Sequence, residues 1–303
     1  DRAGLKDLIE ELDTGDLDLD LTGFDEESLA DLMSEFFVPE ESLTDDDEIP
    51  EDVKPRTKPG DLWQLGDHRL LCADSTKEET LAKLMSSEKA GICFTSPPYN
   101  AGSLNQKGNK ETKPKYNHFE DNQTSEEYLD FLSKNLLLML KYSTEVFYNL
   151  GLVQNNKITI FKLIDAFNQK FKDIIYWKKS SVAPHIIPGI INNMVEMIIC
   201  FGNGKRKFIN AQFSQGTYWN VIEGNNAGQN EFASVHKATF PVYLPANIIS
   251  NFSKNDDIVI DCFLGTGTSL IACEKLKRIC YGIEIDPQYC DVAIQRWEDF
   301  TGK

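Results

Sequence analysis

Two hydrophobic periods alternate along the chain from about residue 61 onward. Short apolar runs, typical of buried strands, alternate with longer stretches in which apolar positions recur every three or four residues, as in helices. The runs predict strands at 70–73, 92–95, 145–149, 173–177, 195–201, 258–261 and 279–283, and the longer stretches predict helices at 77–85, 124–141, 157–169, 245–252, 269–276 and 288–300. Thr124 and Glu127 have the spacing of a capping box at the start of the second helix. This order predicts an α/β domain with a mostly parallel, doubly wound sheet and helices on both faces.

The first part of the chain follows a different pattern. Residues 5–12 and 29–37 are amphipathic and are joined by acidic connectors, and prolines stand at positions 50, 55 and 59. Acidic connectors of this kind are typical of solvated linkers. We therefore predict an acidic leader with two short helices over residues 1–58 and one large folded domain over residues 59–303.

The net charge of −17 belongs to this leader. Residues 1–54 contain 21 acidic and three basic side chains, whereas residues 55–303 contain 27 acidic and 28 basic ones. A strongly acidic surface repels phosphate, so the total charge alone would argue against a nucleic-acid partner. Because the folded body is nearly neutral, the distribution of charge removes that objection.

Cysteine usage and hydropathy narrow the class of protein further. Seven cysteines lie scattered through apolar runs, with no CxxC pair and no metal-ligand spacing. This predicts buried, reduced thiols in a cytoplasmic protein, with neither disulfides nor a metal site. No apolar run approaches the ~18 residues of a membrane-spanning helix. The chain shows no signal peptide and begins at Asp1 rather than Met, which suggests an excised or processed fragment.

A glycine turn after the strand at 258–261 is the first candidate site. Gly265 and Gly267 lie between this strand and the next helix, and Glu284 ends the following strand 17 positions after Gly267. Glycines let a ligand approach the backbone, and a carboxylate at a strand end can accept both hydroxyls of a ribose. The pattern predicts half of a nucleoside-cofactor site, and the alternative is a tight turn that needs glycine only for its geometry. Leu270 stands where a dinucleotide motif has Gly or Ala, and no phosphate-loop Gly-Lys-Ser/Thr follows.

The second candidate site is the segment Thr95-Ser96-Pro97-Pro98-Tyr99-Asn100, directly after the strand at 92–95. Two consecutive prolines fix the backbone and remove two N–H donors, so carbonyl oxygens there can face a cleft. Such acceptors beside an aromatic ring suit a planar base that carries an exocyclic amino group. The alternative is a rigid Pro-Pro turn with a packed tyrosine.

Together the two motifs resemble the DNA amino-methyltransferases, which methylate adenine N6 or cytosine N4. Their order here is that of the permuted beta group, and residues 236–241 and 70–75 resemble that group's cofactor-side segments, so the likeness covers 63–300. The resemblance implies S-adenosylmethionine as cofactor and a methyltransferase catalytic domain over 59–303. It implies a catalytic turn of Ser96, Pro97, Pro98 and Tyr99. The cofactor contacts that it implies are Asp74, Thr95, Lys237, Thr239, Phe240, Asp261, Phe263, Gly265, Gly267, Thr268 and Glu284.

The leader has a resemblance of its own. Residues 21–27 together with residues 63–70 resemble phage and mobile-element proteins that carry a ParB-like domain ahead of such a methylase. On this interpretation residues 1–54 are a connector, and a ParB-like domain that would precede them is missing. We expect deletion of residues 1–54 to preserve cofactor binding and DNA binding.

Double-stranded DNA is the partner that the resemblance implies, and the target base must leave the duplex to reach the site. Basic side chains expected to contact phosphate are Lys107, Lys110, Lys113, Lys115, Lys179, His185, Lys205 and Arg206, with solvated surface loops as the alternative. Target recognition is expected within 100–122 and 180–235. Ser96 in place of Asp leans slightly toward cytosine N4. Methylation of a protein glutamine or RNA, a DNA-binding partner without catalysis, a homodimeric assembly and a paired restriction enzyme stay open.

Overall fold

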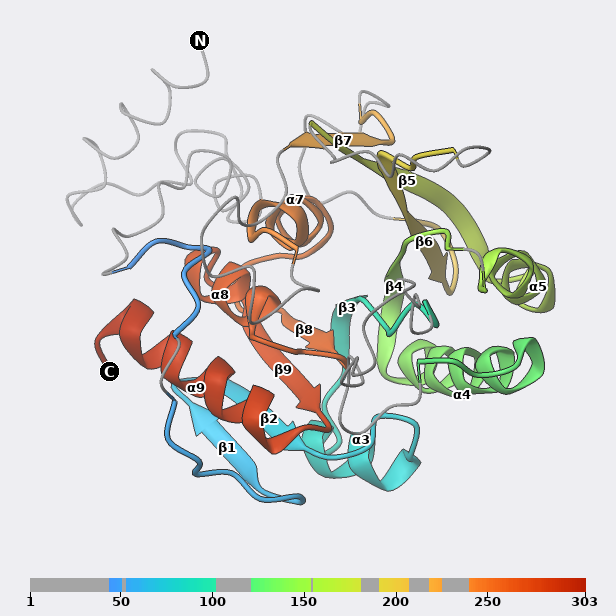
Figure 1. Cartoon of the computed structure of the whole chain (residues 1–303). Coiled ribbons are helices and arrows are strands. Elements are labelled where there is room, and N and C mark those ends of the chain that lie inside the picture. Colours follow the sequence, from blue (N-terminus) through green and yellow to red (C-terminus); the bar gives the residue numbers. More distant parts are fainter. Residues whose placement is uncertain are drawn as a thin grey trace, which may run out of the picture.

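The computed structural model describes residues 44–50, 53–101, 121–153, 155–180, 191–206, 218–224 and 240–303. Its strands are β1 (Leu62–Leu65), β2 (His68–Cys72), β3 (Ala90–Thr95), β4 (Ser143–Leu150), β5 (Phe171–Lys179), β6 (Val195–Gly202), β7 (Val221–Gly224), β8 (Ile258–Asp261) and β9 (Ile279–Glu284). Its helices are α3 (Glu78–Met85), α4 (Ser125–Tyr142), α5 (Lys157–Ala166), α7 (Tyr243–Phe252), α8 (Thr268–Lys275) and α9 (Pro287–Thr301). Figure 1 shows these helices packed around one twisted sheet.

The strands form a nine-stranded sheet in the order β1-β2-β9-β8-β3-β4-β6-β5-β7. The five central strands from β2 to β4 are parallel, β1 and β6 run antiparallel to their neighbours, and β7 is parallel to β5. The predicted α/β fold with a mostly parallel sheet is confirmed. All five parallel strands end at one edge of the sheet, which we call the carboxyl edge.

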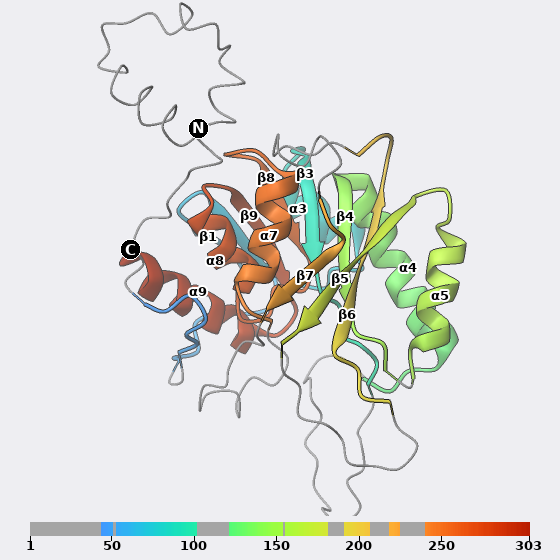
Figure 2. The ribbon, with the colours of Figure 1, turned by 90° about the horizontal axis from the view of Figure 1, so that it is seen from above.

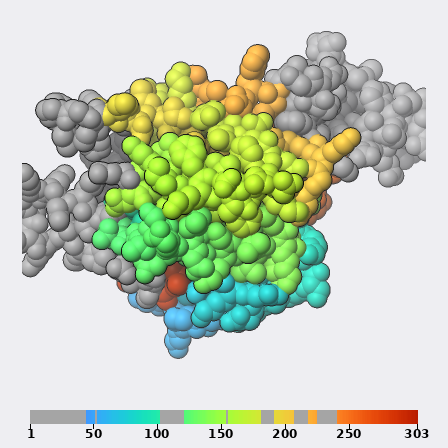
Figure 3. All heavy atoms as spheres, turned by 90° about the vertical axis from the view of Figure 1, so that its right-hand side faces the viewer, coloured from blue at the N-terminus to red at the C-terminus, as the bar shows by residue number. Residues whose placement is uncertain are grey.

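Helices cover both faces of the sheet because the strands alternate their apolar side chains between two cores. Along β3, Ile92 and Phe94 join the core under α7, α8 and α9, whereas Cys93 between them joins the core under α3, α4 and α5. Figure 2 shows α7, α8 and α9 on one side of the sheet and α4 and α5 on the other. In Figure 3, α4 and α5 form the outer surface of that second side.

The predicted elements agree with the structure at nearly every strand and helix, and the capping box of Thr124 and Glu127 is present. Two edge strands, β1 and β7, were not predicted. The helix predicted over 157–169 ends at Ala166. All seven cysteines are free and buried, as predicted. The amphipathic segments 5–12 and 29–37 lie outside the described residues, and in the part that is described no helix is long and apolar enough to cross a membrane.

Candidate functional site

The two sequence motifs meet at the carboxyl edge, on either side of the boundary between β8 and β3. From β3 the chain continues through α4 to β4 on one side, and from β8 it continues through α8 to β9 on the other. Ligands of open α/β sheets bind in the crevice outside such a switch point. The loop after β3 carries the Pro-Pro turn and the loop after β8 carries the glycine turn.

The glycine turn needs glycine at both positions for its backbone. Gly265 and Gly267 have φ values of 56° and 85°, which a side chain would strain. A Cβ on Gly267 would lie 3.1 Å from the Cβ of Ala293, so α9 packs directly against the turn. At Gly265 the nearest atom is a carbonyl oxygen 4.0 Å away, which leaves open space beside the backbone.

Glu284 lies at the end of β9 beside this turn. Its carboxylate accepts the backbone N–H of Gly265 at 2.8 Å and that of Asp286 at 2.9 Å. Burial raises the pKa of Glu284 to about 7, and these N–H donors counteract the rise. Each carboxylate oxygen has two lone pairs, so the side chain keeps acceptor capacity after both backbone bonds.

Asp261, at the end of β8, forms hydrogen bonds to residues of both loops or of the strands that precede them. Its carboxylate accepts the hydroxyls of Thr95 at 2.7 Å and Ser269 at 2.6 Å, and the backbone N–H of Phe263 at 3.1 Å. Asp261 is buried, and burial raises the pKa of its carboxyl. These bonds hold the ends of β3 and β8 in fixed relation.

The Pro-Pro turn is fixed by hydrogen bonds from outside the loop. The hydroxyl of Tyr128 donates to the Pro98 carbonyl at 2.6 Å, and the amide of Asn156 donates to the Tyr99 carbonyl at 2.7 Å. Asn100 has a φ of 56° and exchanges hydrogen bonds with the backbone of Gln123. The Pro98 carbonyl is therefore committed to the scaffold, and Ser96 and Pro97 carry the remaining carbonyls of the turn.

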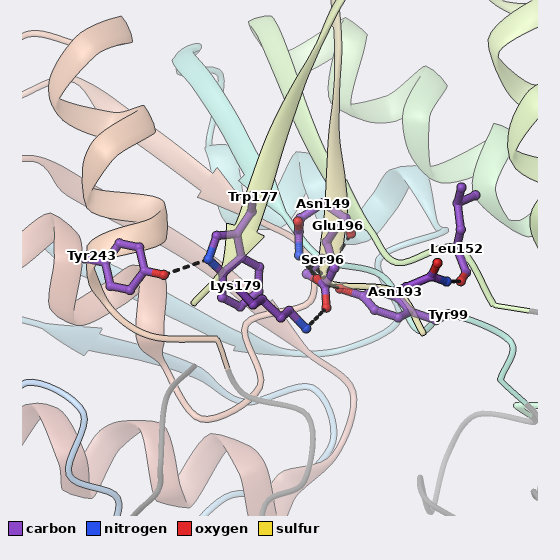
Figure 4. A network of polar contacts seen from close by, with 9 residues as sticks. All are labelled: Ser96, Tyr99, Asn149, Leu152, Trp177, Lys179, Asn193, Glu196 and Tyr243. Atoms are coloured by element: carbon purple, nitrogen blue, oxygen red, sulfur yellow. Dashed lines mark hydrogen bonds and ion pairs between the residues drawn. The ribbon is translucent and has the colours of Figure 1, made fainter. Parts of the chain in front are cut away.

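The hydroxyl of Tyr99 lies in a polar network that Figure 4 shows from close by. It donates to a carboxylate oxygen of Glu196 at 2.7 Å and accepts the side-chain amide of Asn149 at 3.0 Å. The same Asn149 amide lies 3.1 Å from Glu196, and the Ser96 hydroxyl lies 3.3 Å from the Tyr99 hydroxyl. These contacts fix the orientation of the Tyr99 ring.

Lys179 extends the network toward α7. Its ammonium pairs with the second carboxylate oxygen of Glu196 and lies 4.7 Å from the centre of the Trp177 ring. The Trp177 indole N–H in turn donates to the Tyr243 hydroxyl at 2.7 Å. Lys179 and Glu196 keep 20% and 14% of their side-chain surface exposed, so this pair forms a partly open wall beside Tyr99 (Figure 4).

Glu196, Asn149 and Asn156 are site residues that the sequence analysis missed. Glu196 follows the first residue of the apolar run 195–201, and Asn149 is the only polar residue among the last five of β4. A polar residue at either end of an apolar strand could have identified Asn149 and Glu196 from the sequence. β6 runs antiparallel to β4, and this brings the start of β6 to the carboxyl edge.

Three other predicted cofactor residues lie in the described part of the chain next to the strands and helices of the site. Phe240 packs edge-on against Phe94 with ring centres 5.6 Å apart, and Phe263 contacts Phe131 at 5.7 Å. Asp74 follows β2 and accepts the backbone N–H and the hydroxyl of Thr76. Lys237 and Thr239 lie outside the described residues.

The predicted DNA contacts divide into three groups. Lys179 lies in the site, as described above. Arg206 lies at the opposite edge of the sheet, pairs with the largely buried Glu145 and packs over Phe252, and Lys205 precedes it there. This placement does not favour a DNA contact by Arg206, because it lies at the edge of the sheet away from the two loops. The remaining predicted contacts are outside the described residues: Lys107, Lys110, Lys113, Lys115 and His185.

Metal-binding geometry is absent from the described ranges, where no group of three His, Cys, Asp or Glu side chains could hold an ion. Comparison with known families adds the identity of the fold. The family model described as DNA methylase matches residues 91–295, more than half of the chain. The chain belongs to this DNA methylase family. The resemblance drawn from the two motifs is thereby confirmed.

A second family model, described as the ParB-methyltransferase HTH domain, matches residues 3–59. This match supports the resemblance of the leader to ParB-linked methylases. It also assigns a domain to the stretch that we expected to be a connector. The acidic segment 44–50 lies within this match, ahead of the DNA methylase match that begins at residue 91.

Curated relatives include type II methyltransferases. M.Cfr9I of Citrobacter freundii is 28% identical over 127 residues, which cover 40% of this chain and 42% of that protein. M2.LlaDCHI of Lactococcus lactis subsp. cremoris is 23% identical over 75% of this chain and 88% of its own length. The chain thus spans less than half the length of M.Cfr9I.

Solved structures show the same fold. The PvuII DNA methyltransferase, described as cytosine-N4-specific, matches with a TM-score of 0.57 and 19% identity over 75% of this chain and 85% of that one. The complex of M1.HpyAVI with SAM matches with a TM-score of 0.52 and 19% identity over 75% of this chain and 98% of that one. At this identity the matches establish the fold.

Proposed function

We propose that this chain transfers a methyl group from S-adenosylmethionine to an exocyclic amino group of a base flipped out of double-stranded DNA. One observation carries the proposal. The hydrogen bond between Thr95 and Asp261 joins the strand that leads to Ser96–Tyr99 to the strand that leads to the glycine turn. A base held at the first loop and a cofactor held at the second would meet at the switch point. The family match and the named relatives support the same reaction class.

The residues around the glycine turn fit S-adenosylmethionine. The open space beside Gly265 would admit part of the ligand, and Glu284 would accept the ribose hydroxyls. Three side chains would line the adenine end of the cofactor. Phe263 follows β8, Phe240 precedes α7 and Asp74 follows β2. Thr268 begins α8, and Lys237 and Thr239 would complete the contacts. When bound, S-adenosylmethionine supplies an electrophilic methyl group on a sulfonium.

The Pro-Pro turn would activate the amino group by position and electrostatics. The nitrogen lone pair of an exocyclic amine is delocalised into the ring, so the amine is a weak nucleophile. The carbonyl oxygens of Ser96 and Pro97 would accept hydrogen bonds from the two N–H groups of the amine. These bonds would draw the hydrogens out of the ring plane and make the nitrogen lone pair available for attack. Tyr99 would stack on the base, a contact worth ~1–3 kcal/mol in single-strand binders. The network of Asn149 and Glu196 would hold that ring in place, and no covalent intermediate is needed.

Cytosine N4 is the target base that we favour slightly over adenine N6, on Ser96 alone. Lys179 would contact the phosphate beside the flipped nucleotide, because it lies next to Tyr99 with an exposed fraction of 20%. The basic side chains of the segments 100–122 and 180–235 would supply further phosphate contacts. Residues 3–59, as an HTH match, would add a second contact to DNA.

A methyl-acceptor panel tests the reaction class. The chain would be incubated with S-adenosylmethionine carrying a radiolabelled methyl group and, in separate reactions, duplex DNA, single-stranded DNA, RNA and a bacterial protein extract. We expect label in DNA. Label confined to protein or RNA would refute the DNA reaction, and cofactor binding with no transfer to any acceptor would support a DNA-binding partner without catalysis.

A further inference from the structure

The acidic segment at residues 44–50 lies against the catalytic fold at three points. The backbone carbonyl of Asp46 accepts a guanidinium N–H of Arg296 at 2.7 Å, and the Asp46 carboxylate pairs with Lys275 on α8. The carboxylate of Asp47 accepts the backbone N–H of Val242 at 2.8 Å. This acidic segment is therefore bound to α8, to α9 and to the residue that precedes α7.

Arg296 also contacts the glycine turn. Its side chain is 4% exposed, and its other terminal nitrogen donates to the Thr266 carbonyl at 3.1 Å and lies 3.2 Å from the Thr268 hydroxyl. Thr266 and Thr268 flank Gly267, whose backbone packs on Ala293 one turn earlier in α9. One guanidinium thus links the acidic segment to the residues on both sides of Gly267.

The charge of Arg296 makes this link depend on the acidic segment. Burial lowers the pKa of Arg296 to about 10, and the carboxylates of Asp47, Asp46 and Asp45 counteract the drop. A buried cation needs a nearby counter-charge to stay in place. The acidic segment supplies it from outside the catalytic domain.

A second route runs through Asp47. Val242 immediately precedes α7, and Phe240, two residues earlier, packs edge-on against Phe94 of β3. The bond from the Val242 N–H to Asp47 therefore anchors the segment that carries Phe240. Both routes start in the same three-residue acidic stretch and end at residues that we assign to the cofactor.

We propose that Asp46, Asp47 and Arg296 are positioning residues of the cofactor site, so that the acidic segment 44–50, which lies within the HTH match, couples the N-terminal domain to cofactor affinity. This inference rests on the proposed function. Release of the segment would leave Arg296 without its counter-charge and free both the glycine turn and the start of α7. By reciprocity, cofactor binding would tighten the segment on the catalytic fold. This proposal replaces the expectation that deletion of residues 1–54 preserves cofactor binding: we now expect the deletion to weaken it.

Variants of the full chain that keep the size or the charge of these side chains test the coupling. The dissociation constant for S-adenosylmethionine would be measured by calorimetry for wild type, the double variant Asp46→Asn/Asp47→Asn, and Arg296→Lys. The matched control is Glu48→Gln, which removes one exposed carboxylate from the same segment. We expect affinity to fall about tenfold in the double variant and in Arg296→Lys, typical of a coupling between sites, and to stay unchanged in Glu48→Gln.

Hydrogen exchange gives a readout that a purely structural role would not move. Saturating cofactor should slow amide exchange across 44–50 in wild type, and less so in the double variant. Lowered thermal stability with unchanged affinity and with no cofactor effect on exchange would overturn the coupling and leave a structural contact. Failure of wild type to bind the cofactor would instead refute the proposed function.

Discussion

Substitution of Gly151 by alanine tests whether the placement of the Tyr99 ring sets the rate. Gly151 directly follows β4, and a Cβ on it would lie 2.9 Å from Cε2 and 3.1 Å from Cδ2 of Tyr99. Carbon atoms in contact are about 3.5 Å apart or more, so the ring must move by about 0.6 Å. The hydroxyl bonds to Glu196 at 2.7 Å and to Asn149 at 3.0 Å would lengthen or break in response.

The expected effect follows from the size of that displacement. A misplacement of about 1 Å at a reacting centre can cost about 100-fold in rate, so a movement of about 0.6 Å should slow methyl transfer about tenfold. Single-turnover transfer of a labelled methyl group to duplex DNA measures this rate, and calorimetry measures cofactor affinity, which should not change because the glycine turn lies on the other side of the switch point.

Gly91→Ala is the matched control. Gly91 lies at the start of β3, and its added Cβ would lie 3.1 Å from Oδ2 and 3.4 Å from Cγ of Asp257, remote from Tyr99. We expect wild-type transfer by this variant. A Gly151→Ala enzyme that transfers methyl within twofold of wild type would refute the assignment of Tyr99 as the base platform.

Three further predictions address the two loops. Tyr99→Ala should lose most turnover while cofactor affinity stays at the wild-type value, and full turnover would remove Tyr99 from the mechanism. Gly265→Asp should abolish cofactor binding in calorimetry, because the residue has a φ of 56° and the new side chain would fill the open space in which we place the cofactor; retained binding would place the cofactor elsewhere. The Glu284 pKa of about 7, raised from 4.5, predicts cofactor affinity that weakens by up to about tenfold per pH unit below 7. The native state then holds the proton that the unfolded state releases, so the contribution of Glu284 to stability falls as pH rises from 4.5 to 7 and is level above. The contribution of Glu284 to both pH dependences should be absent from Glu284→Gln, and equal slopes in wild type and variant would contradict the assignment.

Much of the fold could be predicted because the spacing of apolar residues along the chain reflects which side chains are buried in each strand and helix. The strands at 92–95 and 258–261 are continuous apolar runs, as buried parallel strands require, and the motifs that follow them identify the carboxyl edge. β1 and β7 were missed because edge strands of four residues with half-exposed side chains have little periodicity. The sequence also could not show which acids and bases pair across the fold.

Two residues illustrate that limit. Glu196 reaches Tyr99 only because β6 runs antiparallel beside β4, a pairing between segments about 50 positions apart. Arg206 belongs to a basic cluster in the sequence, yet its partner Glu145 lies 61 positions away and neutralises it inside the fold. The sequence shows where charged residues lie along the chain. Whether such a residue can contact a ligand depends on its partners in the folded structure, and these are far away in the sequence.

The central claim is that the turn at Ser96–Tyr99 directs a methyl group to an exocyclic amine. Duplex DNA incubated with the chain and S-adenosylmethionine carrying a heavy-isotope methyl group, then digested to nucleosides and analysed by mass spectrometry, tests it directly. The account predicts label in N4-methylcytosine or N6-methyladenine. Label in a ring-carbon product such as 5-methylcytosine, or unlabelled DNA from an enzyme that binds the cofactor, would contradict it.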